Sequence, residues 1–69
     1  MLNKTLLREK LKAERFSVHS FASAMKLSDP TMTRKLSGTS DFKVGEVDKA
    51  RELLRLSDLE LVEIFFAKK

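Results

Sequence analysis

Apolar residues recur along this chain every three or four positions, the spacing that places them on one face of an α-helix. Strand-like alternation is missing, and the residues that interrupt helices are only Pro30, Gly38 and Gly45. The pattern therefore predicts an all-α protein. We expect five helices, over residues 4–14, 18–25, 29–36, 44–54 and 58–67.

Polar residues suited to helix starts precede four of these segments. Their side-chain oxygens can accept a hydrogen bond from a free N–H group of the first helical turn. The residues expected to act in this way are Asn3, Ser17, Ser28 and Ser57. Ser57 and Glu60 have the spacing of a capping box, and Phe16 precedes its cap as a hydrophobic staple does. Gly38 has the place of a glycine that ends a helix.

Chain length and composition narrow the protein class. At 69 residues the chain is long enough for one domain, 1–69, and lacks cysteine. With one histidine, His19, it has no set of residues for a His- or Cys-based metal site. No signal peptide or membrane span is visible, so we expect a cytoplasmic protein that does not enter membranes.

The sequence also lacks the features of an active site. Acidic residues such as Glu60 and Glu63 have no nucleophile or base beside them, so we expect no enzymatic activity. We likewise expect no cofactor and no small-molecule substrate.

Charge is unevenly distributed. Residues 1–43 carry nine basic and four acidic side chains, a net charge of +5, whereas residues 44–69 carry five basic and six acidic ones, a net charge of −1. A basic first part is typical of proteins that bind polyanions. A solvated surface with a mild excess of lysine explains the same numbers, so charge alone leaves both interpretations open.

Residues 16–38, FSVHSFASAMKLSDPTMTRKLSG, contain two short amphipathic helices joined by the three-residue turn Lys26-Leu27-Ser28. The positions expected to be buried are Phe21, Ala22, Leu27 and Met32. Small Ala22 allows close contact between the two helices. This spacing is that of a helix-turn-helix, over about residues 17–37, whose second helix enters the DNA major groove.

At these residues the sequence resembles the lambda-repressor/Cro-like (XRE-type) helix-turn-helix family. The family's first-helix pattern falls on Phe16 to Ala22, its turn and second-helix pattern on Leu27 to Arg34, and its closing glycine on Gly38. The stretch RKLSGTSDFKVGEV, followed by LVEIFF, is similar to small phage-encoded regulators. The resemblance implies a five-helix, lambda-repressor-like domain.

The resemblance also assigns roles to residues. It implies that base edges are contacted by Asp29, Pro30, Thr31, Thr33 and Arg34. It implies phosphate contacts by Ser17, Ser28, Lys35, Thr39, Ser40 and Lys43. Arg34 is the best candidate to read sequence, because a guanidinium can bond guanine O6 and N7 together.

Three positions depart from the family pattern. Val18 replaces the usual glutamine, and Lys26 stands where glycine usually adopts a left-handed conformation. Asp29 and Pro30 form the tip of the reading helix, where an aspartate repels phosphates unless it accepts from a cytosine amine. Asp29 is better explained as a favourable charge at a helix start, with a specific contact to DNA or protein as the alternative. His19 is expected to be an ordinary surface residue.

The last segment indicates a protein interface. Adjacent Phe65 and Phe66 cannot both face one core, so we expect one of them, with Leu61, to contact a partner. A homodimer would place one reading helix in each of two operator half-sites.

Two functions remain open at this point. The first is a DNA-binding transcriptional regulator, Cro-like or repressor-like, of a phage-type lysis/lysogeny switch in a bacterial host cell. Its partner would be double-stranded operator DNA. The second is an antirepressor, or modulator of repression, that binds a partner phage repressor through the same fold.

Overall fold

The computed structural model describes residues 2–66, which form five α-helices and no strand. The helices are α1 (Lys4–Ala13), α2 (Val18–Ala24), α3 (Asp29–Ser37), α4 (Val44–Leu54) and α5 (Asp58–Phe65). The all-α prediction is confirmed, and each helix begins at the predicted residue. The predicted end of the last helix, Ala67, lies outside the described residues.

The helix starts are capped by the four predicted side chains. The Asn3 side chain accepts a hydrogen bond from the N–H of Leu6 at 3.1 Å. In the same way, each hydroxyl of Ser17, Ser28 and Ser57 accepts from the N–H of the residue three positions later. The predicted capping box is present, since the Glu60 carboxylate accepts from the Ser57 N–H at 3.0 Å. Phe16 packs edge-on against Phe21, with ring centroids 5.6 Å apart, as the staple requires.

Left-handed residues end four of the helices. Arg15, Lys26, Gly38 and Arg55 all have positive φ, so the chain turns sharply after α1, α2, α3 and α4. The prediction for Lys26 is confirmed, with φ at 59°. These turns shift helix ends by one residue. α1 stops before Glu14, α2 stops before Met25, and α3 extends to Ser37.

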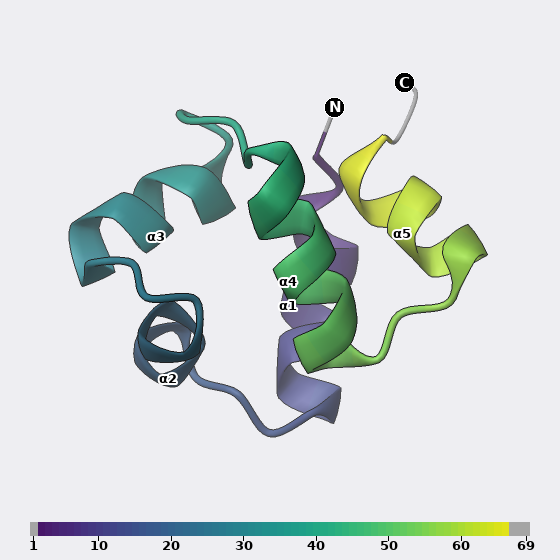
Figure 1. The fold of residues 1–69 in the computed structure, drawn as a ribbon, viewed down its shortest axis with the longest axis horizontal. Helices are drawn as coiled ribbons and strands as arrows, with labels where there is room; N and C mark the ends of the chain where they lie inside the picture. The colour runs from purple at the N-terminus through teal and green to yellow at the C-terminus, as the bar shows by residue number, and fades with distance from the viewer. Residues whose placement is uncertain (1, 67–69) are drawn as a thin grey trace.

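The core draws on all five helices. Its fully buried large side chains are Leu7, Phe21, Met32, Leu36, Leu54 and Ile64. In Figure 1, α2 and α3 lie at one end of the molecule and α5 at the other, with α1 and α4 between them. The N-terminal segment is joined to α5 by a 2.7 Å hydrogen bond from the Asn3 N–H to the Ile64 carbonyl. No helix among the described residues is both long and apolar enough to cross a membrane.

Candidate nucleic-acid interface

The helix pair α2–α3 is built around a tight turn. Ala22 is fully buried where the two helices pack, and its carbonyl accepts from the Leu27 N–H at 2.9 Å. Leu27 is half-buried against the core, and Ser28 then caps α3. Because the turn is fixed by Lys26 and Leu27, α3 is held at a set angle and presents one face to solvent.

Four residues predicted to touch bases share that outer face of α3. Asp29, Pro30, Thr33 and Arg34 are all exposed, and their spacing places them together on one side of the helix. Thr31 is half-buried, and its hydroxyl accepts from Ser28 at 2.8 Å. The structure therefore brings together four of the five predicted base-contacting residues on an accessible surface.

Arg34 is the cation best placed on this face. Among the described residues it takes part in no ion pair, so its guanidinium is free for an external partner. Its backbone carbonyl is used by the turn that follows α3, because it accepts from the N–H groups of Thr39 and Ser40. The backbone of Arg34 is thus held by the following turn, whereas its side chain is available to bind a partner.

The other predicted phosphate contacts lie at the two ends of α3. Near its start, Ser17 and Ser28 are exposed, although their hydroxyls already cap α2 and α3. Beyond its end, Thr39 and Lys43 are exposed and Ser40 is half-buried. Lys43 donates its backbone N–H to Glu46 and forms no side-chain ion pair among residues 2–66. These groups therefore lie beside the exposed face of α3 and leave it accessible.

Lys35 does not fit its predicted role. The residue is only 6% exposed, and its ammonium lies 2.8 Å from the Glu46 carboxylate and 2.9 Å from the Asp41 carbonyl. It also lies 5.8 Å from the centre of the Phe42 ring. The prediction of an exposed Lys35 contacting phosphate is wrong, because α3 turns this position toward α4 and the loop between them.

Glu46 is held in its charged form by this arrangement. Its partial burial alone would raise the pKa of the carboxyl. Hydrogen bonds from the Lys35 ammonium and the Lys43 N–H, together with both lysine charges, outweigh burial and keep the pKa of Glu46 below its usual range. The pair therefore fastens the end of α3 to the start of α4.

A hydrogen bond that the sequence did not reveal joins the first turn of α2 to the first residue of α3. His19 Nδ1 lies 2.8 Å and 3.0 Å from the two carboxylate oxygens of Asp29. His19 is exposed as expected, but it belongs to the candidate interface because it bonds the first residue of α3. Ten residues separate the partners, so no local sequence pattern links them.

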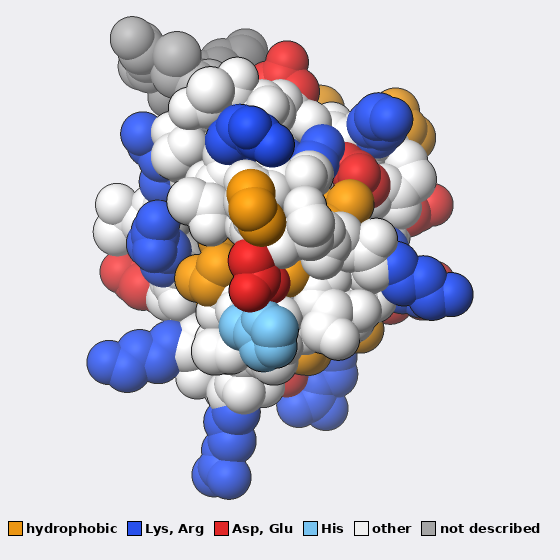
Figure 2. All heavy atoms as spheres, turned by 90° about the vertical axis from the view of Figure 1, so that its left-hand side faces the viewer, with side chains coloured by type: hydrophobic (Ala, Val, Ile, Leu, Met, Phe, Trp, Pro, Cys, Tyr) orange, Lys and Arg blue, Asp and Glu red, His pale blue; other side chains and the backbone are white. Residues whose placement is uncertain are grey.

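Basic side chains outnumber acidic ones around the edge of this face, and the acidic ones lie among them (Figure 2). Figure 2 shows the α2–α3 end of the molecule with a histidine and an acidic side chain near its centre. Lysine and arginine side chains project around the rim of the same view. A polyanion that follows the rim would meet positive charge, with hydrogen-bonding groups of α3 between.

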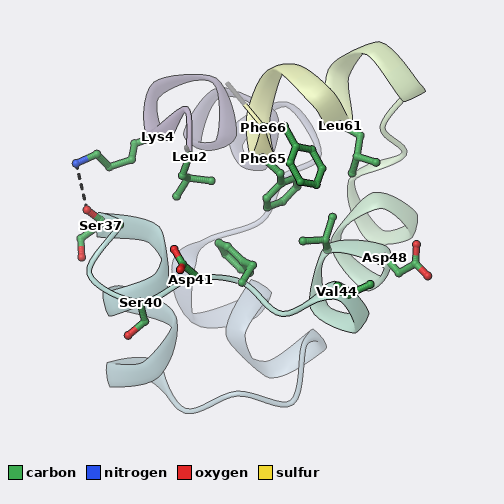
Figure 3. Close-up of a pocket in the computed structure, with 13 residues that line it drawn as sticks. Leu2, Lys4, Ser37, Ser40, Asp41, Val44, Asp48, Leu61, Phe65 and Phe66 are labelled. Atoms are coloured by element: carbon green, nitrogen blue, oxygen red, sulfur yellow. Dashed lines mark hydrogen bonds between the residues drawn. The ribbon is translucent and has the colours of Figure 1, made fainter. Parts of the chain in front are cut away.

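A second surface lies around the start of α4 and the end of α5. It is a groove of about 1020 Å³ (Figure 3), and we call it the α4–α5 groove. Its apolar lining consists of Leu2, Phe42, Val44, Val47, Leu61, Phe65 and Phe66. Lys4 borders the groove and donates to the Ser37 carbonyl at 3.1 Å.

The two phenylalanines at the end of α5 differ in environment. Phe65 is buried and packs edge-on against Phe42, with ring centroids 5.3 Å apart. Phe66 is 59% exposed, and Leu61 is half-buried. The structure thus assigns Phe65 chiefly to the core of one chain. Phe66 remains the predicted interface residue with an accessible ring.

Ligand chemistry elsewhere is sparse in the described part of the chain. Residues 2–66 contain no group of three His, Asp or Glu side chains close enough to hold a metal ion. The two surface features that could bind a partner are the exposed face of α3 and the α4–α5 groove.

The chain matches one protein-family model. The model, described as "Protein of unknown function (DUF739)", aligns with residues 7–68, which include all of α2, α3, α4 and α5. No curated protein matches the chain.

Proposed function

We propose that this chain, which belongs to the DUF739 family, is a helix-turn-helix transcriptional regulator that reads operator DNA with α3. The observation that carries the proposal is the exposed face of α3, with Arg34 unpaired among the described residues. A helix held by a short turn against a supporting helix is the element that enters a major groove. The resemblance to Cro-like and repressor-like proteins suggests a phage-type lysis/lysogeny switch in a bacterial cytoplasm.

The roles of the residues follow from their chemistry. Arg34 would grip guanine O6 and N7, and Thr33 would bond a neighbouring base edge. Lys43 would bind a phosphate as a point charge beyond the end of α3. Lys35 is excluded from this set, because its ammonium is already bound to Glu46. The proposed activity is binding, with no catalytic step and no cofactor.

Operator binding is proposed to involve two copies of the chain. Phe66 exposes its ring beside the α4–α5 groove, whose apolar walls suit the same ring from a second copy. An interface at Phe66 leaves the outer face of α3 free, because the groove includes only the last residue of α3, Ser37. Two reading helices then face two half-sites.

The first test is the affinity of the chain for DNA duplexes selected from a random library, measured by fluorescence anisotropy over a range of salt. Binding with a log–log salt slope of several negative units is expected. Arg34→Ala should make the binding free energy for the selected site less favourable by about 1–3 kcal/mol. It should also reduce the preference for one base at a single position of the site. Lys43→Ala should lower the affinity for all duplexes by the same factor and reduce the magnitude of the log–log salt slope by about one.

Lys49→Ala is the matched control, because Lys49 is an exposed lysine on α4 to which no DNA contact is assigned. It should leave the base preference unchanged. Failure of the unaltered chain to select any duplex would overturn the proposal, as would an Arg34→Ala variant with unchanged base preference.

A second candidate is an antirepressor that binds a partner repressor. The apolar α4–α5 groove favours it, since such a surface also suits a protein partner. Asp29 at the tip of α3 favours it too, because an acidic group suits the basic reading surface of another regulator. Release of the neighbouring repressor from its DNA, without binding by this chain alone, would support this candidate over the first.

A further inference from the structure

We propose that His19 is a DNA-contacting residue in its protonated form, bridging Asp29 and a DNA phosphate so that DNA binding takes up a proton. The inference rests on the proposed DNA-binding function and concerns the same face. It addresses an otherwise unfavourable feature, an exposed carboxylate at the tip of the helix that approaches a polyanion.

The hydrogen bond fixes which ring nitrogen faces Asp29. An ionised carboxylate only accepts hydrogen bonds, so Nδ1 must carry the proton that it donates over 2.8 Å. The remaining nitrogen, Nε2, lies on the opposite edge of the ring. The His19 side chain is 80% exposed, so Nε2 is accessible to solvent or to an incoming ligand.

The protonation state of Nε2 then decides the charge of the pair. With Nε2 unprotonated, His19 is neutral and the pair keeps the negative charge of Asp29. When Nε2 takes a proton from solvent, the ring becomes an imidazolium, the pair becomes neutral, and Nε2–H can donate to a phosphate oxygen. DNA phosphates lower the local potential, so a bound duplex favours the protonated ring.

The surroundings contain no competing carboxylate. Asp29 is the one carboxylate within ion-pair distance of His19 among residues 2–66. The other charged groups of α2, α3 and their turn are all basic: Lys26, Arg34 and Lys35. On α1, which packs against α3, the charged side chains are Lys4, Arg8, Glu9, Lys10 and Lys12, and none of these pairs with His19 or Asp29.

The sign of the coupling between proton uptake and DNA affinity follows from this arrangement. A bound state that holds its proton more tightly than the free state gains affinity as pH falls. The two carboxyls with a resolved shift, Glu46 and Glu60, have pKa values below the usual range. They therefore stay charged near neutral pH. His19 is also the single histidine of the chain.

The experiment measures affinity for the selected duplex between pH 6 and 8 at constant ionic strength. The unaltered chain should bind about tenfold more tightly at pH 6, the effect of one charge-assisted hydrogen bond. His19→Gln should bind at every pH as the unaltered chain binds at pH 8. Asp29→Asn should bind more tightly than the unaltered chain at pH 8, because the uncompensated charge is gone.

Lys12→Gln serves as the control for charge. It removes an exposed positive charge on α1 that does not contact His19 or Asp29, so it should shift affinity equally at every pH. Calorimetry in buffers of different ionisation enthalpy gives the number of protons taken up on binding. This number should be positive for the unaltered chain and fall to near zero for His19→Gln.

The outcomes separate this inference from the function on which it rests. Absence of binding at every pH overturns the DNA-binding proposal itself. Binding that depends on Arg34 but takes up no proton overturns the role of His19. Proton uptake that persists in His19→Gln overturns it too. Both results leave the proposal that α3 reads DNA unchanged. Circular dichroism of each variant checks the fold, which both substitutions should preserve because the two side chains are exposed.

Discussion

Lys35 illustrates how position on a helix overrides residue type. Three of its neighbours, Asp41, Phe42 and Glu46, surround the ammonium with a carbonyl, a ring and a carboxylate. A buried ion pair of this kind contributes little when both partners are present, but its loss is costly because one charge remains buried and unpaired. The pair therefore makes the junction of α3 and α4 sensitive to single substitutions.

Replacing Lys35 by Met tests this description. The substitution should lower the free energy of unfolding by about 3 kcal/mol, since it leaves Glu46 partly buried without its cation. Adding Glu46→Gln should restore most of the loss, because the amide oxygen can still accept from the Lys43 N–H. Urea unfolding measures both effects. Equal instability of the single and double variants would contradict the account.

Acid sensitivity provides an independent readout of Glu46. Its pKa in the folded chain lies below the usual carboxyl value, so the carboxylate stabilises the fold above that value. This contribution is lost as pH falls through the folded pKa. Urea unfolding of Glu46→Gln should therefore depend less on pH below about 4.5 than unfolding of the unaltered chain.

The sequence predicted residues whose partners are close along the chain. Ser17 and Ser57 cap helices through groups three residues away, so a short pattern identifies them. Lys35 and His19 bond partners eleven and ten residues away, and those contacts depend on how α3 packs. Whether a polar residue on α3 faces solvent or the core is decided by that packing, which the periodic pattern left ambiguous for Lys35.

At the scale of elements, α2 depends most on its cap. It has only seven residues, and isolated helices of that length are unstable in water. Ser17 and Ser20 stabilise its start reciprocally, because each hydroxyl accepts from the other's N–H at 3.0 Å and 2.9 Å. The supporting helix of the candidate interface thus relies on two serines.

Ser17→Ala should lower the free energy of unfolding by about 1 kcal/mol, the usual cost of losing an N-terminal cap. Ser23→Ala is the control, since Ser23 is exposed within the same helix and outside the capping box. It should cost little, because alanine is the better helix former. A Ser17→Ala variant as stable as Ser23→Ala would argue against the cap.

Helix boundaries were predicted to within one residue for the first four helices. The differences at Glu14 and Ser37 arise because left-handed residues, Arg15 and Gly38, set where the hydrogen-bond ladder stops. Glycine marks such a position in the sequence, whereas arginine does not. The end after α1 was therefore harder to place than the start of α2.

At the scale of the whole molecule, the outer face of α3 and the α4–α5 groove are separate surfaces, although Ser37 of α3 and Ser40 of the following loop also line the groove. The exposed face of α3 is polar and rimmed with positive charge, whereas the α4–α5 groove is apolar. This separation allows one surface to meet DNA while the other meets protein. The proposed dimer depends on it.

Phe66→Ala should weaken the proposed dimer at least tenfold, because an aromatic ring central to an interface commonly contributes about 2 kcal/mol or more. Leu59→Ala is a matched control, since Leu59 is 69% exposed on α5, which Phe66 directly follows, but does not line the groove. Sedimentation equilibrium gives the dissociation constants. A chain that sediments as a monomer at the concentrations that saturate DNA would rule out the dimer.

The hydrogen bond between Asn3 and Ile64, with the Lys10–Glu60 ion pair at 2.9 Å, joins the first helix to the last. On a ribosome, α1 is made before α5, the helix that packs against it and adds Ile64 and Phe65 to the core that includes Leu7. Until α5 emerges, α2 and α3 have no finished support beneath them. The support for the proposed interface can therefore form only after α5 has been synthesised.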